Sequence, residues 1–224
     1  MMPVDFPLQS VPLFAHLSDE EAESIARATR ERSYPKNSVI VFEDDPGDAM
    51  FVVKSGQVKV VLIGEDGREV ILSVLGDGDF FGEMALIDDQ PRSAHVIAME
   101  DSRLLVLYRD DFHRCLESTP RIALGLLRAL SRRLRSADDK IGSLVLLDVP
   151  GRVARLLLEL ADEGNGTTIS RNITHHTIAQ MVGSSRETVS RTIRTFADGK
   201  MIEVSKDTIE ISDRSKLESI AGLA

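Results

Sequence analysis

The sequence predicts an α+β fold with a β-rich N-terminal domain, a long helix and a C-terminal winged helix-turn-helix domain. Three observations support this: short β-prone segments broken by glycines between 39 and 107, apolar residues spaced by three and four between 127 and 144, and a helix–turn–helix pattern between 173 and 196. The expected domains are the β domain at 1–119, the long helix and hinge at 120–148, and the helix-turn-helix domain at 149–224.

The N-terminal domain is expected to be an antiparallel β-roll or jelly roll. A helix from about 18 to 30 comes first, because Ser18 can cap it and three acidic residues follow in its first turn. Six β-prone segments then follow between Val39 and Leu107, separated by turns that contain glycine. Short strands at this spacing are typical of a roll with two packed sheets.

The net charge of −9 is unevenly distributed along the chain. Residues 1–119 carry a net charge of −12, residues 120–148 carry +3, and residues 149–224 are neutral. DNA phosphates would repel the first region, whereas the C-terminal region can present a locally basic face. This asymmetry would orient the molecule on DNA.

The composition is that of an ordinary globular protein, and the start MMPVDFPLQS lacks the features of a signal peptide. We therefore expect a cytoplasmic protein with no membrane segment. Cys115 is the single cysteine, which excludes an internal disulfide bond and is most simply a packed thiol.

A long helix is expected from Pro120, since proline is tolerated in the first turn. Its apolar residues follow the a and d positions of heptads, which favours pairing of two copies into a homodimer. These seam residues are Leu127, Leu130, Leu134, Ala137, Ile141 and Leu144. The alternative is that the helix packs on its own domain, which also requires an apolar stripe. Asp148 interrupts the seam and marks the expected hinge.

The segment FFGEMALIDDQPRSA, residues 80–94, contains the residue types of a nucleotide site. Gly82 lets backbone amides approach a ligand oxygen, and Arg92 offers a planar fork of donors that suits a phosphate. Glu83 can accept a hydrogen bond from a sugar hydroxyl. Taken singly, a Gly-Glu pair is usually a turn and an Arg-Ser pair a solvated surface pair, so the argument depends on the whole pattern.

This segment resembles the phosphate-binding cassette of cyclic nucleotide-binding domains, and the chain as a whole resembles the CRP/FNR family of bacterial transcription regulators. The resemblance implies that cAMP is the allosteric ligand and that Gly82, Glu83, Arg92 and Ser93 contact its ribose and phosphate. It further implies ligand contacts from Met84, Leu72, Ser73, Leu75, Arg133, Ala137 and Asp138. Strand positions such as Leu72 and Leu75 equally well fill a core.

Ala137 and Asp138 depart from the threonine and serine with which members of the family hold adenine. Alanine donates no hydrogen bond, and an ionised aspartate only accepts one. An acceptor could bind the exocyclic amine of adenine or the donors of guanine. The sequence therefore favours cAMP, with cGMP as a second possibility.

Residues 173–196 follow a helix-turn-helix pattern. Thr174 and Ser185 are expected helix caps, Gly183 breaks the first helix, and a short hairpin after Asp198-Gly199 would form a wing. The family resemblance assigns base reading to Arg186, Glu187 and Arg191 in a palindromic TGTGA-like site. The expected DNA contacts are Thr174, His176, Ser185, Arg186, Glu187, Thr188 and Arg191, although a solvated helix face would also carry such residues.

Other functions remain possible at this point. The same fold could respond to cGMP, cyclic di-GMP or no ligand, or the chain could be a cyclic-nucleotide-sensing module that regulates a partner protein without reading DNA. No catalytic set of residues is apparent, and His95 is a lone histidine without a partner at metal-ligand spacing, so neither an enzyme nor a metal site is expected. The expected partners are double-stranded DNA, a second copy of the chain and RNA polymerase.

Overall fold

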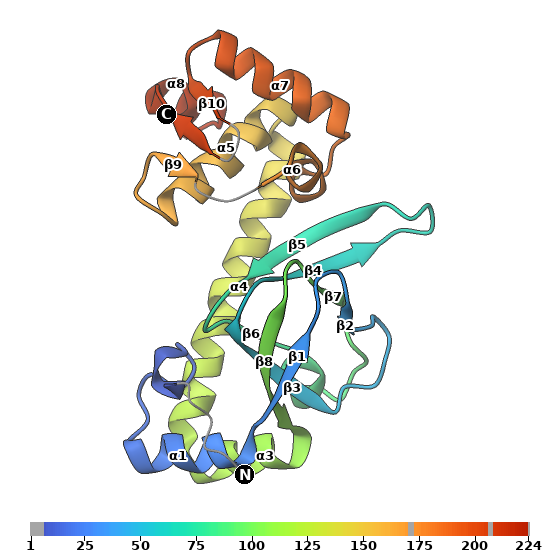
Figure 1. The fold of residues 1–224 in the computed structure, drawn as a ribbon, viewed down its shortest axis with the longest axis vertical. Helices are drawn as coiled ribbons and strands as arrows, with labels where there is room; N and C mark the ends of the chain where they lie inside the picture. Colours follow the sequence, from blue (N-terminus) through green and yellow to red (C-terminus); the bar gives the residue numbers. More distant parts are fainter. Residues whose placement is uncertain (1–6, 170–172, 206–207, 224) are drawn as a thin grey trace. The chain divides into compact units, whose positions relative to one another are not determined.

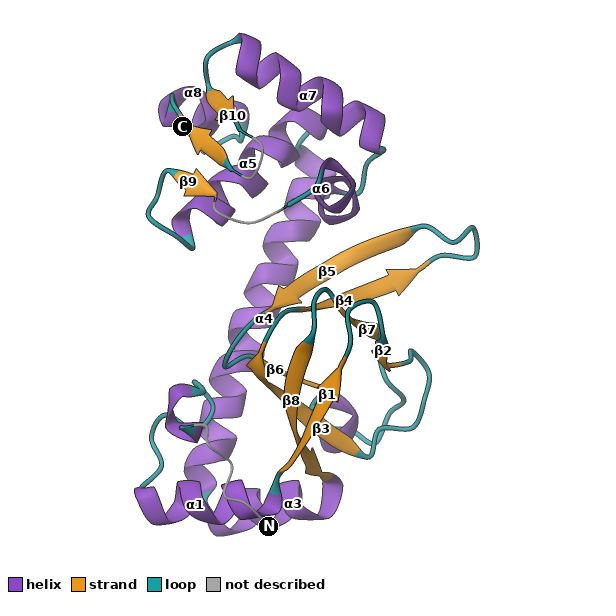
Figure 2. Ribbon diagram, viewed as in Figure 1, coloured by secondary structure: helices purple, strands orange, loops and turns teal. Residues whose placement is uncertain are grey.

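The computed structural model describes residues 7–169, 173–205 and 208–223. The chain divides into two compact units, Met1–Arg133 and Leu134–Ala224, and the division falls inside the long helix α4 (Pro120–Leu146). Figure 1 follows the chain from end to end, and Figure 2 separates its helices from its strands. None of the helices in the described ranges is long and apolar enough to cross a lipid bilayer.

The described part of the first unit is built on two four-stranded antiparallel sheets with strand orders β1-β8-β3-β6 and β2-β7-β4-β5. Its strands are β1 (Arg30–Tyr34), β2 (Val39–Val41), β3 (Ala49–Ser55), β4 (Val58–Ile63), β5 (Glu69–Leu75), β6 (Phe80–Phe81), β7 (His95–Ala98) and β8 (Ser102–Tyr108). Its helices are the 3-10 helix η1 (Leu8–Ser10), α1 (Asp19–Ala28), α2 (Met84–Ile87), α3 (Arg109–Ser118) and the first part of α4. The predicted β-roll is confirmed.

The two faces of β3 explain how this unit is layered. Successive strand residues point to opposite faces, so Phe51 and Val53 pack with the second sheet. Met50 and Val52 point the other way, into a core shared with α1, α3 and α4. Figure 1 shows α1 and α3 at the end of β3 and β8 that lies away from β4 and β5. Both faces of β3 are therefore buried.

Two elements of this unit differ from the expectation. The first helix ends at Ala28 and not near residue 30, because the chain then enters β1, which pairs with β8 at the sheet edge. This strand is mostly exposed and polar, so it lacks the alternation that indicates a half-buried strand. Helix α3 (Arg109–Ser118) was also not predicted, since it follows β8 without an intervening turn.

Helix α4 begins at Pro120 as predicted, and its apolar residues lie on two faces. Ile122, Leu126 and Ala129 are buried in the core of the first unit, and Leu130 packs against that core. The other apolar residues are exposed, which we call the α4 stripe: Leu124, Leu127, Leu134, Ile141, Leu144, Val145 and Leu146. Contacts with its own domain and an exposed apolar stripe therefore coexist on one helix, and Leu130 packs with its own domain.

The described part of the second unit is a helical domain with a three-stranded sheet, ordered β10-β11-β9. Its elements after α4 are α5 (Val149–Asp162), β9 (Thr168–Ile169), α6 (His175–Val182), α7 (Arg186–Asp198), β10 (Ile202–Val204), β11 (Ile209–Ile211) and α8 (Arg214–Ile220). Asp148 caps α5 by accepting a hydrogen bond from the amide of Gly151 at 2.9 Å. The predicted helix-turn-helix and wing are confirmed, whereas α8 and β9 were not predicted.

Helices α6 and α7 are placed by local signals. Thr174 and Ser185 cap them, accepting hydrogen bonds from Thr177 N–H at 3.0 Å and from Thr188 N–H at 3.1 Å. Between them Gly183 has φ +64°, the left-handed conformation that ends a helix. The inner side of α7 is fixed by three buried side chains, those of Val189, Ile193 and Phe196. Its opposite side is left to solvent.

Candidate functional site

Gly82 and Arg92 lie in direct contact in the first unit. Arg92 donates from Nη1 to Gly82 O at 2.8 Å and from Nη2 to Ala49 O at 2.7 Å. Gly82 has φ +81°, and a Cβ built there would approach Arg92 Nη1 to 2.6 Å and Ala49 O to 3.2 Å. Glycine is thus required both by the backbone conformation and by the approach of the guanidinium.

Arg92 is an almost completely buried cation, with 6% of its surface exposed. Burial lowers the pKa of its guanidinium, and the carboxylate of Asp48, 3.8 Å from Nη2, opposes that shift. A second cation, Arg109, also lowers this pKa. Arginine nevertheless stays charged at neutral pH, so the site contains a fixed positive charge with little competing water.

Glu83 is 1% exposed and follows Gly82 at the start of α2. Its Oε1 accepts a hydrogen bond from Arg133 Nη1 at 2.6 Å. Arg133 also donates to Phe80 O and lies 4.6 Å from the centre of the Phe80 ring. Glu83 Oε2 is buried and has no hydrogen-bond partner in the structure. An unpartnered carboxylate oxygen in this position is ready to accept from a ligand donor.

Arg109 is a member of the site that sequence reasoning missed. Its Nη2 donates to Gly47 O at 2.6 Å and to Ala85 O at 2.8 Å, and its Nη1 contacts Asp89. The Arg109 guanidinium therefore links the loop before β3 to helix α2 through hydrogen bonds, close to Arg92. No local pattern points to Arg109, because two of its three partners lie 62 and 24 positions away in sequence.

The remaining ligand candidates lie in varied environments. Met84 is exposed on α2, Ser93 is exposed after Arg92, and Leu72 is exposed on β5. Ser73 is half-buried, whereas Leu75 packs between the two sheets. Ala137 and Asp138 are exposed on the part of α4 that belongs to the second unit. Within the first unit, the structure brings Gly82, Glu83, Arg92 and Arg133 together.

His95 is half-buried at the start of β7, and both of its ring nitrogens lie near Glu43. Its Nδ1 accepts from the amide of Glu43 at 3.2 Å, and its Nε2 lies 3.5 Å from Glu43 Oε2. Throughout the described residues there is no group of three or more His, Cys, Asp or Glu side chains that could hold a metal ion.

The burial of Cys115, with Asp111 nearby, raises the pKa of its thiol.

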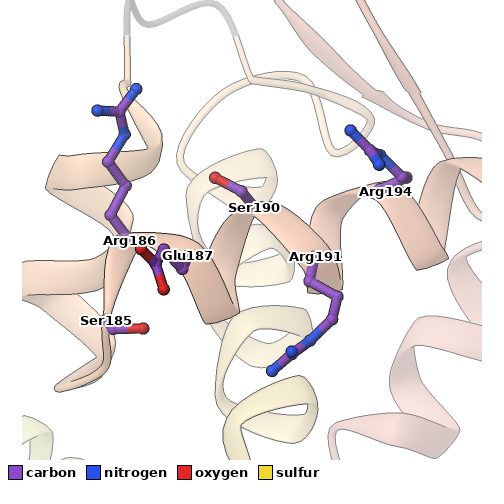
Figure 3. A pocket seen from close by; sticks show the side chains of 6 residues that line it. All are labelled: Ser185, Arg186, Glu187, Ser190, Arg191 and Arg194. Atoms are coloured by element: carbon purple, nitrogen blue, oxygen red, sulfur yellow. The ribbon is translucent and has the colours of Figure 1, made fainter.

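The outer side of α7 forms the second candidate site. An open hollow runs along it, and Figure 3 shows the side chains that line it. These are Ser185, Arg186, Glu187, Ser190, Arg191 and Arg194. The four charged residues are exposed, and none of them forms an ion pair with another described residue. The second helix of a helix-turn-helix with unpaired arginines along its outer side is suited to DNA phosphates and base edges.

The other DNA candidates lie at the ends of these helices. Thr174 and His176 are exposed at the start of α6, and Thr188 is half-buried in the first turn of α7. Ser185 Oγ lies 3.0 Å from Thr188 Oγ1, so the two hydroxyls support each other at the cap. The structure therefore groups Ser185, Arg186, Glu187, Thr188 and Arg191 at one end of α7.

Comparisons with known proteins agree with both sites. A family model for the cyclic nucleotide-binding domain matches residues 31–119, and one for the Crp-like helix-turn-helix domain matches residues 151–220. The cyclic AMP receptor protein of Thermus thermophilus is 37% identical over 97% of this chain and 100% of its own length. A CRP-like cAMP-activated global transcriptional regulator of Mycobacterium tuberculosis is 35% identical over 88% of this chain and 92% of its own length.

Solved structures give the same assignment. The crystal structure of the Thermus thermophilus catabolite activator protein has 38% sequence identity and a TM-score of 0.56, covering 95% of this chain and 100% of that one. A CooA mutant from Carboxydothermus hydrogenoformans has a TM-score of 0.79 at 24% identity and covers 98% of both chains, a similarity of fold alone. The chain, with its cyclic nucleotide-binding domain and Crp-like helix-turn-helix domain, therefore belongs to the CRP/FNR family of DNA-binding transcription regulators.

Proposed function

We propose that the chain acts as a homodimeric transcription regulator whose affinity for DNA is set by a cyclic mononucleotide, with cAMP as the first candidate. The observation that carries this proposal is Glu83 Oε2, a buried carboxylate oxygen without a partner next to a buried arginine. A buried acceptor without a hydrogen bond destabilises the unliganded protein. A bound ligand that donates to this oxygen removes that cost. A ribose hydroxyl supplies that donor.

Arg92 is the proposed phosphate ligand. A guanidinium has five N–H donors, and two hydrogen bonds to backbone carbonyls hold this one in place. Its remaining donors have no hydrogen-bond partner among the described residues. A cyclic phosphate diester has one negative charge and two free oxygens, which matches a single fixed guanidinium.

Arg133 is the proposed link between the ligand and the long helix. It bonds to Glu83 and to Phe80 O, and Leu134 of the α4 stripe follows it directly in the chain. A sugar hydroxyl that donates to Glu83 Oε2 reduces the negative charge that Glu83 Oε1 offers to Arg133, and the change in this bond biases α4. The α4 stripe is the proposed dimer seam, since exposed apolar residues at heptad spacing pair in a second copy.

The base of the nucleotide is less constrained than its phosphate. Ala137 offers no hydrogen bond, and the Asp138 carboxylate accepts donors from either adenine or guanine. The names of the relatives from Thermus thermophilus and Mycobacterium tuberculosis refer to cAMP, which supports cAMP here. Asp138 keeps cGMP as the second candidate.

DNA reading is proposed to depend on Arg186, Glu187 and Arg191. Arginine can bridge O6 and N7 of guanine, and glutamate accepts from N4 of cytosine, which fits a palindromic TGTGA-like site. Ser185, Thr188, Thr174 and His176 are placed at helix ends where they can contact phosphates or flanking bases.

Calorimetric titration of the full chain with cAMP, cGMP and cyclic di-GMP tests the ligand. We expect heat with cAMP, at least about a tenfold loss of affinity for Glu83→Gln and a larger loss for Arg92→Gln. Glu31→Gln is the control, because that carboxylate lies on β1 and, among the described residues, pairs with Lys54 and Arg103. Absence of heat with all three nucleotides in a folded protein contradicts the ligand proposal.

Fluorescence anisotropy with a duplex that contains inverted TGTGA repeats tests the gating. Ligand should change the affinity for this DNA by about 5- to 150-fold, the usual range of allosteric coupling. Equal affinity with and without ligand contradicts gating. Unchanged promoter activity in cells after Glu187→Ala and Arg191→Ala would instead favour a module that acts through a protein partner.

Analytical ultracentrifugation tests the dimer. Leu134→Glu places a charge in the α4 stripe and should convert the dimer to a monomer, because a charge buried in an apolar seam is strongly unfavourable. Val204→Glu is the control, as Val204 is an exposed apolar residue of β10 outside the stripe. A dimer that survives Leu134→Glu shows that the seam lies elsewhere.

A further inference from the structure

A hydrogen bond joins the two helices of the helix-turn-helix on the side where the reading residues lie. His175 begins α6, and its Nδ1 lies 2.9 Å from the hydroxyl oxygen of Ser190, which is in the second turn of α7. Both side chains are half-buried. The bond therefore connects an imidazole of α6 to a hydroxyl of α7.

Ser190 differs in this respect from the other hydroxyl residues in the middle of α7. Thr192 donates to Thr188 O at 3.0 Å, and Thr195 donates to Arg191 O at 3.1 Å. These are the usual bonds of a helical serine or threonine to the carbonyl four residues earlier. Ser190 forms no such bond in the structure, so its hydroxyl is oriented by the imidazole of another helix.

Ser190 also belongs to the candidate DNA site. It lines the open hollow on α7, one turn beyond Arg186 and Glu187 and directly before Arg191. Figure 3 shows its hydroxyl projecting from the same stretch of helix as these side chains. A serine hydroxyl in the major groove can either donate to a base or accept from one. Which of the two it does depends on where its single proton points.

Whether Nδ1 of His175 carries a proton determines that direction. When the imidazole is neutral with its proton on Nε2, Nδ1 accepts the Ser190 O–H, and the lone pairs of the serine oxygen are left to accept from a base amine. When the imidazole is protonated, Nδ1–H donates to the serine oxygen. The serine proton is then free to turn toward an acceptor such as guanine O6 or thymine O4.

We propose that His175 is a specificity-determining residue, which sets whether Ser190 reads a donor or an acceptor on DNA according to the protonation of the imidazole. The inference rests on the proposed reading of DNA by α7. The charged side chains that line the hollow with Ser190 are Arg186, Glu187, Arg191 and Arg194. His176 is adjacent to His175, and α5, which also packs against α6, carries Arg152, Arg155, Glu159 and Asp162. Nearby cations oppose protonation of an imidazole, and the phosphates of bound DNA favour it.

The experiment measures base preference as a function of pH. Full-length protein, with and without cAMP, is titrated into duplexes that contain inverted TGTGA repeats and into single-base-pair variants of that site. The quantity compared is the ratio of affinities between variants at one position, measured from about pH 5.5 to about pH 8, across the range in which histidine titrates. A ratio is needed because protonation of the exposed His176 can raise affinity for every duplex equally.

We expect the preference at one symmetric base pair to change by at least about threefold across this range, since a good base contact discriminates by more than that. The change should disappear in His175→Asn, whose amide bonds to Ser190 without titrating, and in Ser190→Ala. It should persist in His113→Asn, a control at an exposed histidine of α3 in the first unit, which has no proposed DNA contact. Circular dichroism melting confirms that each variant is folded.

Two results would overturn the inference. One is a base preference that is the same at every pH in the wild-type protein while DNA binding is intact. The other is a pH-dependent preference that survives in His175→Asn or Ser190→Ala. Loss of all binding to these duplexes at every pH is a different result, since it contradicts the proposed DNA site itself.

Discussion

The proposed ligand cassette, residues 80–94, and α7, the proposed reading helix, both carry arginine and glutamate, but they hold these charges in opposite ways. In the cassette, Arg92 and Glu83 are almost completely buried and bonded to partners within the first unit. On α7, Arg186, Glu187 and Arg191 are exposed, and they form no ion pair with described residues. Buried charges interact strongly but must be positioned by many contacts, whereas exposed charges are screened by water and depend little on the fold.

The difference teaches where each site tolerates change. The cassette should lose stability and function together, because its ligand groups are also structural groups. The reading helix should lose function alone, since surface substitutions away from such contacts change stability by less than about 0.5 kcal/mol. The four predictions below test this division, from the largest expected effect to the smallest.

The first prediction concerns Gly82, where the cassette is most tightly packed. Gly82→Ala should lower the free energy of unfolding by about 3 kcal/mol, because it adds backbone strain and a contact with Arg92. Gly67→Ala is the control, since Gly67 also has a positive φ, +76°, but a Cβ there meets nothing within 4 Å. Urea unfolding compares the two. Equal losses would mean that the close approach of Arg92 costs nothing.

The second prediction concerns Arg186 on the reading helix. Arg186→Ala should weaken binding to a TGTGA-containing duplex by about 2 kcal/mol and relax the preference at one base pair. Its unfolding free energy should stay within about 0.5 kcal/mol of the wild type. Arg103→Ala on β8 is the control, because this exposed arginine lies in the first unit and should leave DNA affinity unchanged. A large loss of stability in Arg186→Ala would break the comparison.

The third prediction concerns the ion pair between Glu83 and Arg133. A double-mutant cycle with alanine at each position should give a coupling free energy of about 1 kcal/mol in the absence of ligand. The exposed pair of Arg27 and Glu23, at 3.9 Å, is the matched control and should give about 0.3 kcal/mol. Thermal or urea unfolding measures both cycles. Similar values would indicate that burial of Glu83 adds nothing to the pair.

The fourth prediction concerns Asp213 in the second unit. Its carboxylate is hydrogen-bonded and paired with Lys216, unlike the exposed charges of α7. Asp213 caps α8, and its hydrogen bonds with Lys216 and Ser215 lower the pKa of its carboxyl from 3.8 to about 2. Because the folded pKa is depressed, the stabilisation is present above about pH 4 and is lost as pH falls toward 2.

The free energies of unfolding of the wild type and Asp213→Asn should therefore differ at neutral pH. The two values should converge as the pH falls from about 4 toward 2. Ser219→Ala near the other end of α8 is the control, because it removes no ionisable group, and its difference from the wild type should not change in this window. A constant difference between the wild type and Asp213→Asn down to pH 2 would show that the charge of Asp213 does not support α8.

The sequence predicts the features that depend on neighbouring residues. Ser185 and Thr174 cap their helices and Val189 is buried, because capping and helical spacing are local properties. The motif places Gly82 and Arg92 in one candidate site, although the hydrogen bond between them, ten positions apart, was not predicted.

The features that depend on distant residues could not be predicted. Arg109 joins the site through carbonyl groups at Gly47 and Ala85, and carbonyls carry no sequence signal. Leu130 fits the heptad pattern, but its side chain packs against the core of its own domain. The bond from His175 to Ser190 needs both helices in place before it can be seen.

The hydrogen bonds from Arg109 and Arg133 to the cassette have a consequence for folding during synthesis of the chain. Residues 80–94 are contiguous, but their side chains are held by groups at Gly47, Ala49, Arg109 and Arg133. A ribosome must therefore extend the chain past residue 133 before all of these contacts can form. Nascent chains that end earlier lack the contacts that hold these side chains, so the proposed binding of nucleotide requires translation of the entire β-roll and the first turns of α4.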